Sequence, residues 1–200
     1  CVRDVLRGVV PKDWDIATNA TPEEIQKIFP HTYYDNAFGT VGVVNDETED
    51  ESLKVIEVTT YRLEGGYRDA RRPESVSFSK NIEDDLKRRD FTINAIAMSF
   101  DFSAEGGSAF GGKGQIIDLY KGQDDLKKGV VRAVGDPNER FSEDALRILR
   151  AIRLGAELGF VIEHETEKAL QNNAKLLEKI SKERIRDEFT KIVMSDQPMQ

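Results

Sequence analysis

The sequence has 200 residues, of which 38% are apolar and 33% are charged, which is enough for one substantial hydrophobic core or two small ones in a globular chain. It has no run of about 18 apolar residues to cross a bilayer and no signal pattern at its start, so we expect no membrane partner. The single cysteine, Cys1, cannot form an internal disulfide. This suits a reducing compartment, and we expect a cytoplasmic protein.

The net charge of -8 argues at first sight against a nucleic-acid partner, because phosphate contacts depend on Lys and Arg. Residues 121–200, however, carry equal numbers of acidic and basic side chains, so the excess acid lies in residues 1–120. Part of that excess is NDETEDES, residues 45–52, which predicts a solvated loop between two strands. The net charge therefore does not exclude RNA.

The chain begins with a short helix-like run, CVRDVLRG, which ends at Gly8. It has no initiator Met, so we expect the N-terminus to be truncated. A strand is predicted over DWDIAT, and a helix follows it. That helix has Thr21 as its N-cap, Pro22 at its first position and Glu24 three residues after the cap, which is a capping-box signature.

Strands and a longer helix are predicted in the next part of the chain. The β-branched runs at residues 39–44 and 53–63 predict strands, whereas IEDDLKRRDFTINAIAMSF, residues 82–100, has the length and propensity of a helix. The Gly-rich EGGSAFGGKG predicts a hairpin or flexible loop. Two short strand candidates, QIIDLY and GVVRAV, come after it.

From Pro137 onward the pattern is helical. NERFSEDALRILRAIRLGAEL, ETEKALQNNAKLLEKI and SKERIRDEFTKIVM all predict helices, with Ser142 and Ser181 as N-caps and Gly159 near a C-terminus. We therefore predict two domains, a mixed α/β domain over residues 1–136 and an all-helical region over residues 137–200.

Acidic residues gather on two of the predicted strands. Asp13 and Asp15 are two residues apart, so in an extended strand both would point to the same face and either meet solvent or share a divalent cation. Glu57 lies in an apolar strand, where a carboxylate is costly to bury alone. It would complete a three-carboxylate metal site if its strand lies beside the first, or it would face water from an edge strand.

Two basic patterns also allow two interpretations. Arg88 and Arg89 suit triphosphate oxygens, because each guanidinium offers a planar fork of donors, but a charged helix face with i,i+4 pairs fits the same residues. Asp144 and Arg147 would be neighbours on a helix, either as an ordinary solvated pair or as a reader of bases. A carboxylate acceptor beside a guanidinium donor complements the Watson–Crick edges of cytosine and adenine, and not those of uracil or guanine.

Five segments resemble, in order and spacing, the class II tRNA nucleotidyltransferases (the bacterial-type CCA-adding enzymes) and the bacterial poly(A) polymerases that share their head. They are KDWDIATNATPEE, EVTTYR, ARRPESVSF, EDDLKRRDFTINAIAM and SEDALRILRAIR. The resemblance runs from Cys1 to about Met194. It implies a DNA polymerase beta-like α/β nucleotidyltransferase head, a mixed sheet with flanking helices, followed by an all-helical neck and the start of a body. Two glycines that normally precede the Arg3-Asp4 pair are missing.

The same resemblance implies the residues of the site. Asp13 and Asp15 match the catalytic carboxylates, which bind Mg²⁺ together with Glu57 as the third ligand. The region 137–200 is expected to bind the nucleobase. The residues expected to bind nucleotide are Arg3, Arg89, Asp144, Arg147, Arg150 and Arg153.

The implied function is template-independent addition of CMP and AMP, from CTP and ATP, to the tRNA 3′ end, with release of pyrophosphate. Bacterial poly(A) polymerase or A-adding activity is the nearest alternative, and a non-catalytic RNA-binding fragment is an alternative of another class. Residues 67–78, YRDARRPESVSF, resemble the flexible loop of members that add the terminal A, although an exposed basic hairpin fits them equally well. The oligomeric state stays open.

Overall fold

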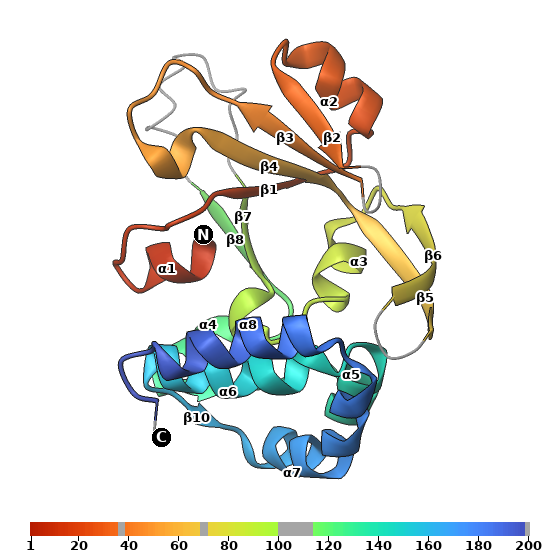
Figure 1. Cartoon of the computed structure of the whole chain (residues 1–200). Coiled ribbons are helices and arrows are strands. Elements are labelled where there is room, and N and C mark those ends of the chain that lie inside the picture. The colour runs from red at the N-terminus through yellow and green to blue at the C-terminus, as the bar shows by residue number, and fades with distance from the viewer. Residues whose placement is uncertain (36–38, 69–71, 100–113, 199–200) are drawn as a thin grey trace. The chain divides into compact units, whose positions relative to one another are not determined.

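The computed structural model describes residues 1–35, 39–68, 72–99 and 114–198 (Figure 1). The chain divides into two compact units, one of Arg3–Arg88 with Cys1 and the other of Arg89–Gln200 with Val2. The predicted Gly-rich loop, residues 105–114, lies almost entirely outside the described residues.

The helices and strands follow one another in this order. Up to Arg88 they are α1 (Val2–Leu6), β1 (Asp15–Thr18), α2 (Pro22–Ile28), β2 (Thr32–Asp35), β3 (Thr40–Val44), the 3-10 helix η1 (Glu51–Leu53), β4 (Val55–Thr60), β5 (Arg62–Arg68), β6 (Arg72–Phe78) and α3 (Ile82–Lys87). After it come η2 (Thr92–Asn94), β7 (Ile96–Ser99), β8 (Gln115–Asp118), α4 (Gly122–Lys128), β9 (Val130–Val131), α5 (Pro137–Glu143), α6 (Leu146–Leu158), β10 (Val161–Ile162), α7 (His164–Asn173), η3 (Ala174–Lys179) and α8 (Lys182–Val193).

A four-stranded mixed sheet forms the first unit, with the strand order β1-β4-β3-β2. β1 is parallel to β4, whereas β3 is antiparallel to both of its neighbours. Val41 and Val58 point to one face and pack with Ile25 of α2 in the hydrophobic core. Because successive residues of a strand point to opposite faces, Gly42 and Glu57 lie on the other face. The predicted mixed sheet with flanking helices is confirmed.

The start of α2 has the predicted capping box. The Thr21 hydroxyl accepts a hydrogen bond from the Glu24 backbone N–H, and the Glu24 carboxylate accepts one from the Thr21 backbone N–H. Pro22 occupies the first helical position, where its missing N–H costs nothing. The preceding strand is also confirmed, but it begins only at Asp15.

Strand β2 was not predicted from the sequence. Its pairing with β3 places Tyr33 beside Gly42, and a Cβ atom added at Gly42 would come within 2.2 Å of the Tyr33 ring. The absence of a side chain at Gly42 therefore lets the ring lie over β3. Formation of β2 therefore depends more on pairing with β3 than on the β propensity of its own four residues.

The helix predicted over residues 82–100 is wrong. α3 ends at Lys87, and the rest of the segment forms η2 and then β7, which pairs with β8. The Asp90 carboxylate accepts a hydrogen bond from the Phe91 backbone N–H at 2.8 Å, so a side chain satisfies a donor that a continuing helix would have used. Sheet pairing then overrides the helix propensity of the last residues.

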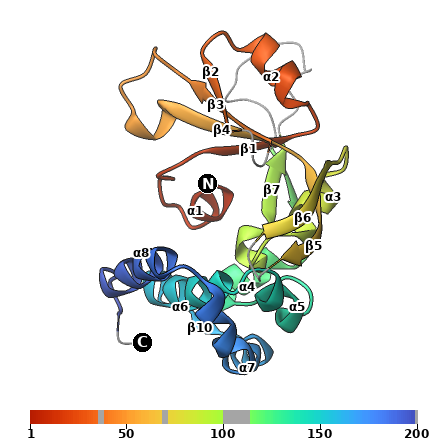
Figure 2. The same ribbon diagram turned by 45° about the vertical axis from the view of Figure 1, so that its right-hand side comes forward.

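The second unit is helical from α5 onward as predicted, with three departures. The region predicted as all-helical contains the short strand β10, and the helix expected over residues 165–180 is α7 followed by the 3-10 helix η3. The helix expected over residues 138–158 is two helices, α5 and α6, and Ser142 lies inside α5 rather than at an N-cap. α6 ends at Gly159, whose φ of 67° suits a residue without a side chain. Two-residue β10 pairs in parallel with β9. α8 lies against α6 in both views (Figure 1 and Figure 2).

The predicted boundary between residues 136 and 137 stays a prediction. In the described part of the chain, no helix is both long enough and apolar enough to cross a membrane.

Candidate functional site

Asp15 and Glu57 lie side by side on the face of the sheet opposite the hydrophobic core. They are register partners in the parallel pair β1–β4, so their side chains point to the same face. On its other side Glu57 pairs with Gly42, which adds no side chain there. Both carboxylates are exposed. The strand of Glu57 thus lies beside that of Asp15, which is the condition for a shared metal site. The role of Glu57 as a metal ligand stays a prediction.

Asp13 precedes β1 in a bend, so the alternation of an extended strand does not govern its direction. Within residues 1–35, 39–68, 72–99 and 114–198, no three or more His, Cys, Asp or Glu residues are grouped so that they could hold a metal ion. Mg²⁺, however, is usually held by one or two carboxylates together with water and substrate phosphates. The exposed oxygens of Asp13 and Asp15 therefore fit this ion by their chemistry, without a preformed three-carboxylate cage.

The two arginines predicted near the triphosphate lie in different compact units. Arg3 of α1 pairs with its neighbour Asp4, with 3.0 Å between Nε and Oδ1. Arg89 is half-buried and follows the end of α3. Their roles at the triphosphate stay predictions.

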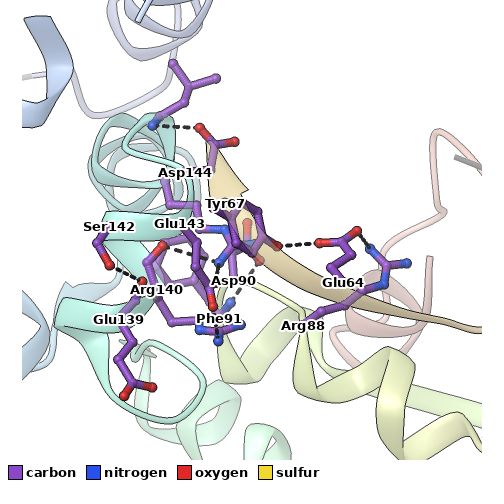
Figure 3. Close-up of polar contacts among 12 residues, drawn as sticks. Glu64, Tyr67, Arg88, Asp90, Phe91, Glu139, Arg140, Ser142, Glu143 and Asp144 are labelled. Atoms are coloured by element: carbon purple, nitrogen blue, oxygen red, sulfur yellow. Dashed lines mark hydrogen bonds and ion pairs between the residues drawn. The ribbon is translucent and has the colours of Figure 1, made fainter. Parts of the chain in front are cut away.

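Glu64 of β5 is the centre of an ion-pair cluster at the base of the β5–β6 hairpin (Figure 3). It accepts hydrogen bonds from Tyr67 and Arg62, and Arg88 Nη1 lies 3.4 Å from its Oε1. Burial by itself would raise the pKa of Glu64, but the Tyr67 hydrogen bond and the charges of Arg88 and Arg62 outweigh it and lower the pKa. The cluster fastens the start of the segment that resembles the flexible loop, of which residues 69–71 lie outside the described residues.

Glu64 belongs to none of the motifs from which site residues were predicted. Its partner Arg88 is 24 residues away in the sequence, and only the alternation of β5 could have marked Glu64 as inward-facing. Arg88 also pairs with Asp85, at 2.6 Å between Nη2 and Oδ1. Arg88 therefore pairs with two carboxylates, one three residues earlier in the sequence and one from the hairpin. Both contacts support the interpretation of Arg88 as a structural residue.

The prediction that Asp144 lies on a helix beside Arg147 is wrong. Asp144 is the residue that separates α5 from α6, with extended backbone angles. Its Oδ1 accepts a hydrogen bond from the Leu146 backbone N–H at 3.1 Å (Figure 3 shows Asp144). Its Oδ2 accepts one from Arg184 Nη2 of α8 at 3.0 Å. A short polar side chain that bonds the backbone two residues ahead ends one helix and starts the next.

Each of the three arginines of α6 pairs with a carboxylate from a different place. Arg147 Nη1 lies 2.7 Å from Glu143 Oε2 at the end of α5, and Arg150 pairs with Asp90. Arg153 contacts Glu157 of the same helix and Glu188 of α8, at 2.8 and 2.7 Å. Successive steps of three rotate by about -60° around a helix, so the three arginines point to different neighbours. Their contacts with nucleotide stay predictions.

Asp90 is buried, and its carboxylate accepts three hydrogen bonds and forms an ion pair. Oδ1 accepts from the Phe91 backbone N–H and from Asn94, and Oδ2 accepts from Arg150 Nε at 2.8 Å (Figure 3 shows Asp90 and Phe91). The ion pair joins Oδ2 to Arg150 Nη2 at 2.6 Å. Burial alone would raise the pKa of Asp90, but the charges of Arg150 and Arg147 and the hydrogen bonds lower it. The carboxylate stays charged in the interior of the second unit, and it holds Arg150.

The chain matches the family "Poly A polymerase head domain" over residues 1–132. Residues 159–200 match "Probable RNA and SrmB- binding site of polymerase A". The chain therefore belongs to the poly A polymerase head domain family, as the five sequence segments predicted.

Its relatives are CCA-adding enzymes. It is 46% identical to the CCA-adding enzyme of Leuconostoc mesenteroides over all of its own length and 45% of that enzyme. The crystal structure of the Bacillus stearothermophilus CCA-adding enzyme in complex with CTP has a TM-score of 0.78 and 42% identity, covering 95% of this chain and 42% of that one. A Thermotoga maritima CCA-adding enzyme complexed with tRNA has a TM-score of 0.71 and 30% identity, over 98% and 42% of the two chains.

The chain thus spans less than half the length of the relatives it matches. The predicted head fold followed by a helical part is confirmed by these structures. Nucleotidyltransferases of this family use a divalent metal.

Proposed function

We propose that the protein adds CMP and AMP, from CTP and ATP, to the 3′ end of tRNA without a nucleic-acid template. The observation that carries the proposal is the identity of 46% with a CCA-adding enzyme over the whole of this chain. In each step the RNA 3′-oxygen forms a bond to the α-phosphorus, and the bond to the leaving pyrophosphate breaks. We also propose a cytoplasmic location, which the proposed tRNA substrate and the single cysteine support.

We assign the transfer chemistry to residues 1–136 and recognition of the nucleobase to residues 137–200. Asp13 and Asp15, with Glu57 beside Asp15 in the sheet, would hold Mg²⁺. A bound Mg²⁺ would supply Lewis-acid chemistry there, lowering the pKa of the RNA 3′-hydroxyl and offsetting the charge that develops on pyrophosphate. Arg3 and Arg89 would neutralise the triphosphate as fixed positive charges.

Base selection requires an acceptor and a donor that complement cytosine and adenine alone. Asp144 offers carboxylate oxygens that already accept one protein hydrogen bond each, and a carboxylate oxygen has room for about two. Arg147 lies three residues later and is oriented by Glu143. This arrangement supports a pair in which Asp144 accepts from the exocyclic amino group and Arg147 donates to the ring nitrogen. Arg150 and Arg153 would lie near the nucleotide.

One experiment separates three alternatives. The full chain is incubated with tRNA that lacks its CCA end, Mg²⁺ and all four labelled triphosphates together, and the products are resolved by length. We expect C, C and A to be added and the reaction to stop. A long A tail would instead indicate a poly(A) polymerase, a single A would indicate an A-adding enzyme, and tRNA binding without incorporation would indicate a non-catalytic RNA-binding protein.

Asp144→Ala is expected to lower the efficiency with CTP and ATP by about ten- to more than a hundredfold. The reason is the loss of a charge-assisted hydrogen bond, worth roughly 1.5 to 3 kcal/mol. UTP and GTP should lose much less, because the same carboxylate repels their carbonyl oxygens. The measurement is the efficiency with all four triphosphates in the variant and in the parent.

The matched control is Asp136→Ala. Asp136 accepts a hydrogen bond from the backbone N–H two residues ahead, that of Asn138, at the start of α5. Asp144 accepts the same kind of bond from Leu146, so both alanine variants lose a side-chain bond to the start of a helix. A uniform loss with all four bases in Asp144→Ala, equal to that in Asp136→Ala, would make Asp144 a structural residue only.

A further inference from the structure

Asp144 is anchored at both carboxylate oxygens, and the two anchors come from different helices. Oδ1 accepts from the Leu146 backbone N–H at the start of α6, and Oδ2 accepts from Arg184 Nη2, 40 residues away in the sequence. A carboxylate held at one oxygen can still rotate about its Cβ–Cγ bond. Two anchors remove this freedom, so Arg184 decides the plane in which the carboxylate lies.

Attachment of α8 to the rest of the second unit does not depend on Arg184 alone. Glu188, one turn later on the same face, is buried and binds Arg153 of α6 at 2.7 Å. Ile192, a further turn along, is also buried. A polar and an apolar contact therefore join α8 to its surroundings independently of Asp144.

The guanidinium of Arg184 is only partly satisfied by the protein. Its Nη2 donates to Asp144, whereas its Nη1 is buried and has no hydrogen-bond partner among the described residues. A buried donor without an acceptor is unfavourable, and such groups in folded proteins call for an explanation. Arg184 therefore stays in this position despite the cost of desolvating Nη1. This is expected of a residue whose role is to orient Asp144.

We propose that Arg184 is a positioning residue for base selection, which acts by fixing the orientation of the Asp144 carboxylate. The proposal rests on the proposed function, in which Asp144 reads the exocyclic amino group of cytosine or adenine. Each anchored oxygen keeps lone-pair capacity for the base. A carboxylate already in its binding orientation loses little freedom when the base arrives, whereas a rotating one must be ordered first.

The test substitutes Arg184→Gln in the full chain and measures transfer efficiency with each of the four triphosphates. We expect CTP and ATP to lose about tenfold, in line with one charge-assisted hydrogen bond, while UTP and GTP change by less than about threefold. Arg184→Lys, which keeps the charge but not the planar fork, should fall between the two. Arg186→Gln is the control, because Arg186 lies two residues away on α8, is 70% exposed and pairs with its neighbour Asp187.

A double-mutant cycle separates positioning from support of the fold. In an Asp144→Ala background, Arg184→Gln should cause no further loss of discrimination, because the group through which it acts is gone. Equal losses with all four bases, or additive losses of discrimination in the double variant, would overturn the positioning role. If Asp144→Ala discriminates normally, the proposed base reading fails and this inference fails with it. If Asp144→Ala loses discrimination and Arg184→Gln and Arg184→Lys both keep it, only the inference about Arg184 fails.

Discussion

Replacing either Asp13 or Asp15 with asparagine is expected to lower nucleotide transfer by more than about a hundredfold, which corresponds to roughly 2.7 kcal/mol of lost transition-state stabilisation. The physical reason is that an amide oxygen carries no negative charge with which to hold Mg²⁺ or to activate the 3′-hydroxyl. Glu57→Gln should cause a loss in the same direction if Glu57, which lies opposite Asp15 in β4, is the third ligand. The measurement is single-turnover transfer of labelled CMP to tRNA at saturating Mg²⁺.

The fold should survive these changes, because Asp13, Asp15 and Glu57 are exposed and one fewer negative charge reduces repulsion between them. Thermal unfolding of each variant should therefore match the parent or shift slightly upward. Glu49→Gln, an exposed carboxylate of the acidic loop, removes a charge of the same kind away from the site. Transfer above about a hundredth of the parent rate in Asp13→Asn or Asp15→Asn would contradict the catalytic role of that residue.

The second large effect concerns stability. Arg150→Met is expected to lower the free energy of unfolding by about 1.5 to 3 kcal/mol, because it removes the half-exposed cation that pairs with the buried carboxylate of Asp90. Adding Asp90→Asn should recover much of this loss, since an amide is far cheaper to bury than an unpaired charge. Urea unfolding of the two single variants and the double variant measures these terms.

The control for this pair is Arg186→Met, an exposed arginine whose loss should change stability by no more than about 0.5 kcal/mol. A loss below about 1 kcal/mol in Arg150→Met would mean that the Asp90–Arg150 pair contributes little to stability. The main role of Arg150 would then be its predicted contact with nucleotide. Comparing unfolding with transfer efficiency thus separates the structural partner of Arg150 from its predicted contact with nucleotide.

The same pair predicts a dependence on pH. The folded pKa of Asp90 lies below its ordinary value because the charges of Arg150 and Arg147 and its hydrogen bonds outweigh the effect of burial. Its contribution to stability is therefore fully present above the unfolded pKa of about 3.9, and it is lost as the pH falls through the lower folded pKa. Arg150→Met should lose this acid-dependent component, and unfolding measured between neutral and acidic pH checks it.

Local signals predicted the elements that depend on local interactions. The capping box of Thr21 and Glu24 marked the start of α2, and Gly159 marked the end of α6. The β-branched runs predicted β3 and β4, because their alternate residues face the core that contains Val41 and Val58. The order of five motifs identified the family, since several weak patterns in fixed order are specific together.

The tertiary structure alone decided which distant residues meet. Residues 96–99 have helical propensity in isolation, yet they form β7 because β8 pairs with them. Similarly, β2 forms because it pairs with β3. The cluster around Glu64 joins the β5–β6 hairpin to Arg88, 24 residues later. Hydrogen bonds between strands, and ion pairs between residues far apart in the sequence, cannot be read from the local periodicity of hydrophobic residues.

The candidate site shows the same division. The sequence by itself determined the family to which the chain belongs, because the order and spacing of its motifs are read directly. It also predicted the metal role of Asp13 and Asp15, which stays a prediction. It predicted Asp144 on the same helix as Arg147, and the structure instead places Asp144 between two helices with its side chain on Arg184. A carboxylate that can bond the backbone two residues ahead competes with the helix at that point, and the cation that binds it comes from a helix 40 residues later, so only the folded chain could decide its partner.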